Sequence, residues 1–189
     1  MFAGSSLGIN ALHRDAATAL AEALVDRGLE LVYGGGCVGL MGVLADAMLA
    51  RGGRVIGVIP HTLMVREVGH RGLTELKVVD SMHERKALMA ELSDGFIALP
   101  GGFGTLEELF EILTWAQLGL HGHPCGALNA DGYFDALFRF LDHSLQQGFV
   151  RTEHRSMLLV DDDPRRLLER FAQYRAPTVE KWLQRSAQT

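Results

Sequence analysis

Short apolar runs alternate with longer amphipathic segments along this chain, and that alternation is what most constrains its fold. Strands that are apolar along their whole length need cover on both faces, so they predict a parallel sheet between two layers of helices. Right-handed crossovers then give a single-domain, doubly wound, Rossmann-like α/β fold. The expected strands are residues 29–33, 54–59, 76–79, 95–99, 124–128 and 157–160, and the expected helices are residues 10–26, 39–50, 82–92, 105–118, 133–147 and 164–174.

Length and charge place further bounds on the protein. Its 189 residues are the size of one ordinary domain, and no repeat, low-complexity tract or linker divides them. We expect a nucleotide-binding Rossmann-like domain over residues 1–176 and a C-terminal tail over residues 177–189. The formal net charge of −5 argues against a general nucleic-acid binder.

Targeting signals and cysteines bear on the compartment. No apolar run approaches the roughly 20 residues that a membrane-spanning helix needs. The N-terminus lacks the basic and apolar regions of a signal peptide. Cys37 and Cys125 have no metal-ligand spacing between them, which is typical of free thiols in a reducing cytoplasm. We therefore expect a cytoplasmic protein with no bound metal and with neither a membrane nor a nucleic-acid partner.

Residues 96–108 combine a short apolar run that ends at Pro100, a glycine turn, and a helix expected to open at Gly104-Thr105. The N–H groups at a helix N-terminus have no intrahelical partner and the helix dipole adds positive charge, so this place suits a phosphate. The Thr105 hydroxyl is expected to cap the helix or to bind an anion. Glu107 and Glu108 would then stand in the first turn, where they serve either chemistry or only the helix dipole.

A second segment, residues 81–89, supplies positive charge. Ser81 is expected to be the N-cap of a helix, with Glu84 completing a capping box. Arg85 and Lys86 then lie in the opening turns, where a cation opposes the helix dipole. An anionic partner would compensate, and it is either a ligand phosphate or one of the two glutamates.

Glycine-rich loops follow three of the strands, at the edge of the sheet where such folds bind ligands. Residues 34–39 formally match the G-x-G-x-x-G pattern. However, this loop follows residues 29–33, which come second after a short first strand expected at residues 1–3, and no acid stands after the next strand to bind a ribose hydroxyl. A mononucleotide is therefore favoured over a dinucleotide. Since no Gly-Lys-Ser/Thr is present, a P-loop is excluded. The phosphate-loop candidates are Gly4, Ser5, Gly35 and Gly36.

Residues 81–87 (Ser-Met-His-Glu-Arg-Lys-Ala) together with residues 100–108 (Pro-Gly-Gly-Phe-Gly-Thr-Leu-Glu-Glu) resemble the LONELY GUY family of cytokinin riboside 5′-monophosphate phosphoribohydrolases. The resemblance covers nearly the whole chain and includes residues 33–36, 57–60, 114–119 and 131–133. It implies hydrolysis of the N-glycosidic bond of an N6-substituted adenosine 5′-monophosphate to free base and ribose 5-phosphate. It also implies no metal, no organic cofactor, and a homodimer with shared active sites that in some members assembles further.

The resemblance assigns roles residue by residue. Arg85 and Glu108 would be the catalytic pair. A carboxylate near the anomeric carbon can stabilise the oxocarbenium-like sugar or activate the attacking water, and a permanently charged arginine can bind phosphate or orient that carboxylate. From the residues alone, Glu67 is an ordinary loop acid and Thr114 an ordinary helical threonine. The substrate contacts implied are Glu67, Lys86, Gly102, Phe103, Gly104, Thr105, Leu106, Glu107 and Thr114.

Other functions stay open at this stage. One is an AMP nucleosidase acting mainly on unmodified purine nucleotides, because base preference depends on the shape of the pocket. Another is a non-catalytic nucleotide or cofactor carrier of the same fold, which would need no Arg85–Glu108 pair. A pyridoxal phosphate decarboxylase would need a Schiff-base lysine. The chain has only Lys77, Lys86 and Lys181, and none lies in a context typical of that cofactor.

Overall fold

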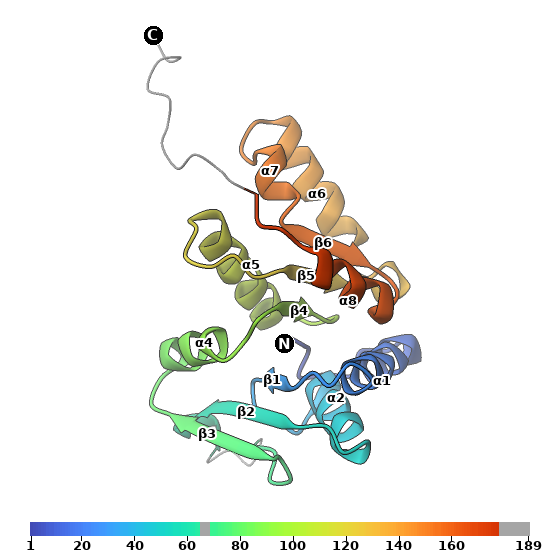
Figure 1. The fold of residues 1–189 in the computed structure, drawn as a ribbon, viewed down its shortest axis with the longest axis vertical. Coiled ribbons are helices and arrows are strands. Elements are labelled where there is room, and N and C mark those ends of the chain that lie inside the picture. Colours follow the sequence, from blue (N-terminus) through green and yellow to red (C-terminus); the bar gives the residue numbers. More distant parts are fainter. Residues whose placement is uncertain (65–68, 178–189) are drawn as a thin grey trace.

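The computed structural model describes residues 1–64 and 69–177, which form an α/β fold with parallel strands (Figure 1). One three-stranded sheet has the order β1-β2-β3 and a second has the order β4-β5-β6. All neighbouring strands within each sheet pair in parallel. The strands are β1 (Leu31–Tyr33), β2 (Val55–Pro60), β3 (Glu75–Val79), β4 (Phe96–Ala98), β5 (Cys125–Leu128) and β6 (Leu158–Asp161).

The first residues of the chain join the two sheets. The Phe2 N–H donates to the Ile97 carbonyl at 3.0 Å, and the Leu99 N–H donates to the Phe2 carbonyl at 2.9 Å. On the other side, the Met1 nitrogen donates to the Val32 carbonyl at 2.8 Å. These residues therefore lie between β1 and β4, as Figure 1 shows, and make one continuous sheet out of the two.

Helices cover both faces of this sheet. Successive strand residues point to opposite sides, so the apolar side chains of one strand are buried in two separate cores. Leu31 and Tyr33 of β1 belong to a core shared with α1, α2 and α8, whereas Val32 belongs to a core shared with α4, α5 and α6. This arrangement confirms the doubly wound α/β prediction. The longer helices are α1 (Ala11–Val25), α2 (Gly39–Ala50), α4 (Met82–Glu91), α5 (Phe103–Gln117), α6 (Asp135–Gln146) and α8 (Pro164–Gln173).

Each expected strand and helix is present, with its ends displaced by at most two residues. Three short elements were not expected, namely α3 (His61–Met64), the 3₁₀ turn η1 (Ala130–Gly132) and α7 (Thr152–Arg155). They are too short to show a hydrophobic period. Within the described ranges, no helix combines the length and the apolar character that a membrane span requires. The expected tail, residues 177–189, lies outside the described residues except for its first residue.

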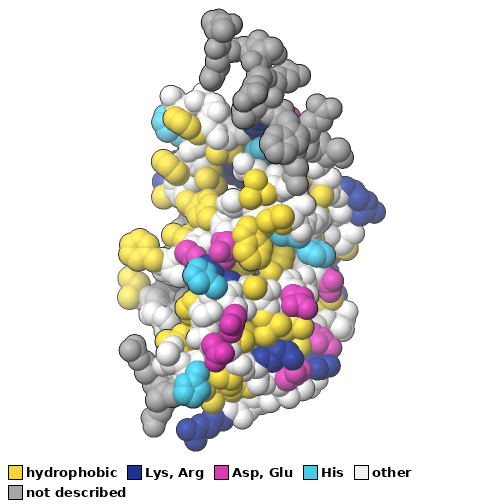
Figure 2. All heavy atoms as spheres, turned by 90° about the vertical axis from the view of Figure 1, so that its left-hand side faces the viewer, with side chains coloured by type: hydrophobic (Ala, Val, Ile, Leu, Met, Phe, Trp, Pro, Cys, Tyr) yellow, Lys and Arg dark blue, Asp and Glu magenta, His cyan; other side chains and the backbone are white. Residues whose placement is uncertain are grey.

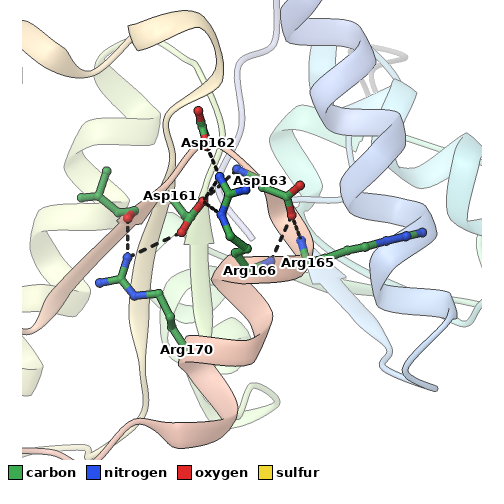
Figure 3. Close-up of polar contacts among 7 residues, drawn as sticks. Asp161, Asp162, Asp163, Arg165, Arg166 and Arg170 are labelled. Atoms are coloured by element: carbon green, nitrogen blue, oxygen red, sulfur yellow. Dashed lines mark hydrogen bonds and ion pairs between the residues drawn. The ribbon is translucent and has the colours of Figure 1, made fainter.

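Ionic contacts attach α8 to the end of β6, and we call these residues the C-terminal ion cluster: Asp161, Asp162, Asp163, Arg166 and Arg170 (Figure 3). The Asp163 carboxylate caps α8 by accepting from the Arg166 N–H at 3.0 Å. The Arg166 side chain pairs with Asp161 at 2.9 Å and with Asp162. Arg170 donates to the Val160 carbonyl. The cluster therefore holds the last helix of the fold in register with its strand.

Candidate active site

The three glycine loops meet at the carboxyl ends of the central strands, as the sequence predicts. The Gly4 N–H donates to the Pro100 carbonyl at 3.0 Å, and the Gly4 carbonyl accepts from the Leu40 N–H at 3.0 Å, at the start of α2. The approach is so close that a Cβ on Gly39 would lie 2.2 Å from the backbone of Ser5. Glycine at these positions is therefore required by backbone contact between the loops.

Arg85 of α4 and Glu108 of α5 come together beside these loops. Their side chains are each 10% exposed, and Arg85 Nη2 lies 3.5 Å from Glu108 Oε1. In the described part of the chain, the buried polar or charged residues are Arg85, Thr105 and Glu108, with exposed fractions of 9%, 4% and 8%. Burial of charge is expensive unless the charge is paired and hydrogen-bonded, and groups buried at such a cost cluster at functional sites. All three residues come from the two motifs that the sequence singled out.

Gly34 makes room for the Arg85 guanidinium. A Cβ on Gly34 would lie 1.8 Å from Arg85 Nη2, so any other residue at this position would displace the arginine. Arg85 Nη1 contacts the Met82 sulfur at 3.7 Å. The Arg85 Nε is buried and has no hydrogen-bond partner among residues 1–64 and 69–177. The backbone at Gly34 thus leaves little freedom for the position of the guanidinium, and the Arg85 Nε–H is left as an unpaired donor within the described part of the chain.

Burial raises the pKa of Glu108 above its usual range, although the positive charge of Arg85 opposes that shift. A carboxyl group with a raised pKa can exchange a proton closer to neutral pH than an exposed glutamate can. The environment of Glu108 therefore suits proton transfer or charge stabilisation, which a solvated acid on the helix surface would perform less well.

Lys86 is held by two carboxylates of the facing helix. Its ammonium group pairs with Glu107 and lies 3.0 Å from Glu111 Oε1. The hydrogen bond that the Lys86 ammonium donates to the Glu107 carboxylate raises the pKa of Lys86. Of the expected anionic partners, Glu108 pairs with Arg85 and Glu107 pairs with Lys86. Glu111 was missed by sequence reasoning. It lies four residues after Glu107 on the same helix face, but this spacing alone does not single it out among helical acids.

The cap of α4 agrees with the sequence prediction except in one bond. The Ser81 hydroxyl accepts from the Glu84 N–H at 3.1 Å, so Ser81 is the N-cap. The Glu84 carboxylate accepts from the Asp80 N–H at 2.9 Å, one residue before the partner expected in a capping box. The capped turn fixes the start of the helix, and with it the direction of the Arg85 side chain.

The start of α5 corrects one sequence prediction. The helix begins at Phe103 with Gly102 as its N-cap, two residues before the expected start, and the Thr105 hydroxyl does not cap it. Glu107 and Glu108 consequently lie in the second turn instead of the first. The expected start was too late because a first helical turn can contain a glycine such as Gly104, although glycine is a poor helix former.

The outer side of this loop is open. A Cβ built on Gly102 or on Gly104 would have no atom within 4 Å, and the Phe103 side chain is 93% exposed. The first N–H groups of α5 have no intrahelical acceptor and carry the positive end of the helix dipole. This loop therefore has the space and the donors that an anion needs.

The other residues predicted to belong to the site differ in their local contacts and exposure. Gly35 adopts a positive φ of 70° and the Gly36 carbonyl accepts from the Tyr33 hydroxyl at 3.1 Å. Thr114 is exposed and its hydroxyl donates to the Phe110 carbonyl at 2.7 Å, the ordinary bond of a helical threonine. Ser5 is exposed and Leu106 half-buried. Glu67 lies outside the described residues.

Comparison with solved structures supports the fold. A molybdenum cofactor binding protein from the phototrophic bacterium Rippkaea orientalis superposes with a TM-score of 0.68 at 20% identity, over 90% of this chain and 93% of that one. The Moco carrier protein from Chlamydomonas reinhardtii gives a TM-score of 0.65 at 19% identity, over 90% and 92% of the two chains. At such low identity the likeness shows a shared fold alone.

Sequence comparison is more specific. The model of a family described as "Possible lysine decarboxylase" matches residues 41–171, which include both motifs of the site. A probable cytokinin riboside 5′-monophosphate phosphoribohydrolase of Oryza sativa subsp. japonica is 49% identical over 96% of this chain and 74% of its own length. A cytokinin riboside 5′-monophosphate phosphoribohydrolase of Arabidopsis thaliana is 47% identical over 96% and 84%. The expected resemblance is confirmed, and the chain belongs to the LONELY GUY family.

Proposed function

We propose that the protein hydrolyses the N-glycosidic bond of N6-substituted adenosine 5′-monophosphates, releasing the free base and ribose 5-phosphate. The observation that carries this proposal is the buried Arg85–Glu108 pair beside an open glycine loop at a helix N-terminus. A phosphate site needs no buried acid, whereas a site that breaks a glycosidic bond does. Relatives at 47% and 49% identity are named for this activity.

Glu108 supplies the acid–base chemistry in this proposal. As the bond between the anomeric carbon and the base nitrogen breaks, its electron pair goes to the base and the sugar becomes cationic. The ionised Glu108 carboxylate stabilises that cation and accepts a proton from the water whose oxygen bonds to the anomeric carbon. The departing base takes up a proton from solvent and leaves as the free base. Arg85 favours the ionised carboxylate against the effect of burial, so it keeps Glu108 ready to accept that proton.

The phosphate is assigned to the glycine loop. The N–H groups at the start of α5, residues 102–105, would bind its oxygens, Leu106 would complete the turn, and Lys86 would add positive charge from α4. The loops that contain Gly4, Ser5, Gly35 and Gly36 would close the other side of the same site. Glu67, Glu107 and Thr114 complete the proposed set of substrate contacts.

Thr114 favours a homodimer with shared active sites. It follows Thr105 by nine residues, which is about 13 Å along a helix, and so lies far from the glycine loop of its own chain. A second copy packed on this helix could bring its Thr114 to the site. Figure 2 shows hydrophobic side chains gathered with acidic ones on the face of α4 and α5. The exposed apolar residues on and next to these helices are Met82, Phe103, Leu118 and Leu120.

Two alternatives are less well supported. A carrier without catalysis would not need the buried acid–arginine pair. A pyridoxal phosphate decarboxylase needs a lysine that loses its proton easily, but Lys86 is held by two carboxylates that raise its pKa. Lys77 pairs with Glu75 at 2.6 Å, and Lys181 lies outside the described residues.

We propose a cytoplasmic location because the free thiols Cys37 and Cys125 fit a reducing compartment.

Release of free base tests the function directly. Purified protein is incubated in parallel with AMP, isopentenyladenosine monophosphate and the two unphosphorylated nucleosides, and the products are separated by chromatography. Base release from the monophosphates alone is the expected result. Faster cleavage of the isopentenyl substrate supports cytokinin activation, whereas faster cleavage of AMP assigns the protein as an AMP nucleosidase. No release from any substrate, under conditions in which a plant relative is active, would contradict the proposal.

A further inference from the structure

Tyr133 lies outside the residues assigned above, yet its side chain reaches the glycine loop. Its hydroxyl donates a hydrogen bond to the Gly101 carbonyl at 2.6 Å. Gly101 precedes the N-cap of α5, whereas Tyr133 follows η1 at the end of β5, so the contact joins segments 32 residues apart. The Tyr33 hydroxyl makes a similar bond to the Gly36 carbonyl of another glycine loop.

The turn before Tyr133 has an unusual backbone. Asp131 has a φ of 54°, and it is the one non-glycine residue with a positive φ in the described ranges. Gly132 follows with a φ of 67°. Left-handed conformations are unfavourable for most side chains, and aspartate tolerates them better than most. These two residues turn the chain so that Tyr133 faces the loop after β4.

Contacts with α1 fix this turn in place. The Asn10 amide donates to the Asp131 carboxylate, while the Asn10 Oδ1 accepts from the Leu12 N–H at 3.0 Å and so caps α1. The His13 ring packs edge-on against the Tyr133 ring with centroids 5.4 Å apart. Tyr133 is therefore held on one side by α1 and bonded on the other to the glycine loop.

The bond to Gly101 determines the direction of an N–H group. A trans peptide unit is planar, so its C=O and the following N–H point in opposite directions, and the structure has no cis peptide bond among the described residues. Holding the Gly101 carbonyl toward Tyr133 therefore turns the Gly102 N–H the other way, at the N-cap of α5. The carbonyls of Pro100, Gly101 and Gly102 are held in turn by the Gly4 N–H, the Tyr133 hydroxyl and the Leu106 N–H.

We propose that Tyr133 is a positioning residue that aims the Gly102 N–H at the 5′-phosphate of the substrate. Without its hydroxyl, the Gly101–Gly102 peptide is free to rotate, because glycine populates many backbone conformations at similar energy. The identity of the anion rests on the proposed function. The contribution belongs to substrate binding, since a phosphate remote from the breaking bond is held equally in the ground state and the transition state.

The test is Tyr133→Phe, which keeps the ring and its packing on His13 and removes only the hydroxyl. KM for the nucleoside monophosphate should rise about two- to twelvefold, the range for loss of one neutral hydrogen bond, while kcat stays nearly constant. Tyr174→Phe, which removes a hydroxyl from the C-cap of α8, is the matched control and should leave both constants unchanged. A merely structural role would lower kcat or the melting temperature instead, and that outcome overturns the proposal.

Binding without turnover separates this proposal from the proposed function. The affinity of AMP is measured by calorimetry for Glu108→Gln and for the double variant that also carries Tyr133→Phe. The second change should weaken AMP binding by the same two- to twelvefold factor, whether or not the wild-type protein releases base. Equal affinities in the two proteins would contradict the role of Tyr133. Absence of base release from the wild type would contradict only the function.

Discussion

Two regions of this molecule pair carboxylates with arginines, and they do so in opposite ways. In the C-terminal ion cluster, Arg166 is 58% exposed in its side chain and lies 2.9 Å from Asp161. In the candidate active site, the side chains of Arg85 and Glu108 are 10% exposed and the closest atoms are 3.5 Å apart. The pair whose arginine is exposed is thus the shorter one, and the pair that is buried on both sides is the longer one.

The pKa values of the two acids also shift in opposite directions. Burial opposes ionisation of Asp161, but the Asp163 N–H and the Arg166 guanidinium bond to its carboxylate and hold its pKa below the usual range. At Glu108 burial prevails over the attraction of Arg85, and the pKa is raised. A short, fully bonded ion pair therefore indicates a structural contact. A buried pair with a raised pKa and unused hydrogen-bonding capacity is of the kind that clusters at functional sites.

The largest effect is expected at the buried acid. Glu108→Gln keeps the shape of the side chain and removes its charge, so base release should fall roughly 10²- to 10⁴-fold, the usual contribution of an acid–base group. The melting temperature should stay close to that of the wild type. Base release by chromatography and circular dichroism on the same preparation check both points. An unaltered rate would show that Glu108 is not the reacting carboxylate.

The next effect concerns pH and tests the role of Arg85. Because burial raises the pKa of Glu108, wild-type activity should decline on the acid side at a pH above that of an ordinary glutamate. Arg85→Ala removes a positive charge that favours the ionised carboxylate, so the pKa of Glu108 rises further and the acid limb of kcat/KM moves to higher pH. The residual activity should also be much lower. A limb that stays in place or moves to lower pH would contradict this pairing.

A smaller effect is expected at Glu111, which shares Lys86 with Glu107. Glu111→Gln removes one of the two charges that hold the ammonium group, so KM should rise by less than about tenfold with kcat nearly unchanged. Glu91→Gln, an exposed acid at the end of α4, is the matched control. Equal behaviour of the two variants in steady-state kinetics would remove Glu111 from the site.

The smallest effect belongs to the C-terminal ion cluster and concerns stability alone. Asp161 has a lowered pKa in the folded protein, so its contribution to stability is present above its unfolded pKa and is lost as pH falls through the folded value. Asp161→Asn should lower the melting temperature by a few degrees at neutral pH, and this difference should shrink at acid pH. Base release should match the wild type at room temperature. A marked loss of activity would erase the contrast drawn between the two regions.

Much of the fold could be predicted because its signals are local. Apolar runs and helical periods depend on neighbouring residues, and each expected element is present. The start of α5 was misplaced because glycines at a helix N-terminus and glycines in a loop look alike in sequence. The chain alone likewise could not distinguish Glu111 from other helical acids. Its partner Lys86 lies 25 residues away and meets it only where α4 packs beside α5.

The sequence by itself determined the order of strands and helices, the glycine loops, the two charged motifs and the family, since all of these are patterns along the chain. Only the tertiary structure decided that Arg85 and Glu108 are buried together and that Gly34 leaves room for the Arg85 guanidinium. It also decided that the Tyr133 hydroxyl bonds to the Gly101 carbonyl. The physical reason is that burial, pKa and hydrogen bonding depend on which distant segments surround a side chain. Those surroundings exist only once the parallel sheet has brought its loops to one edge.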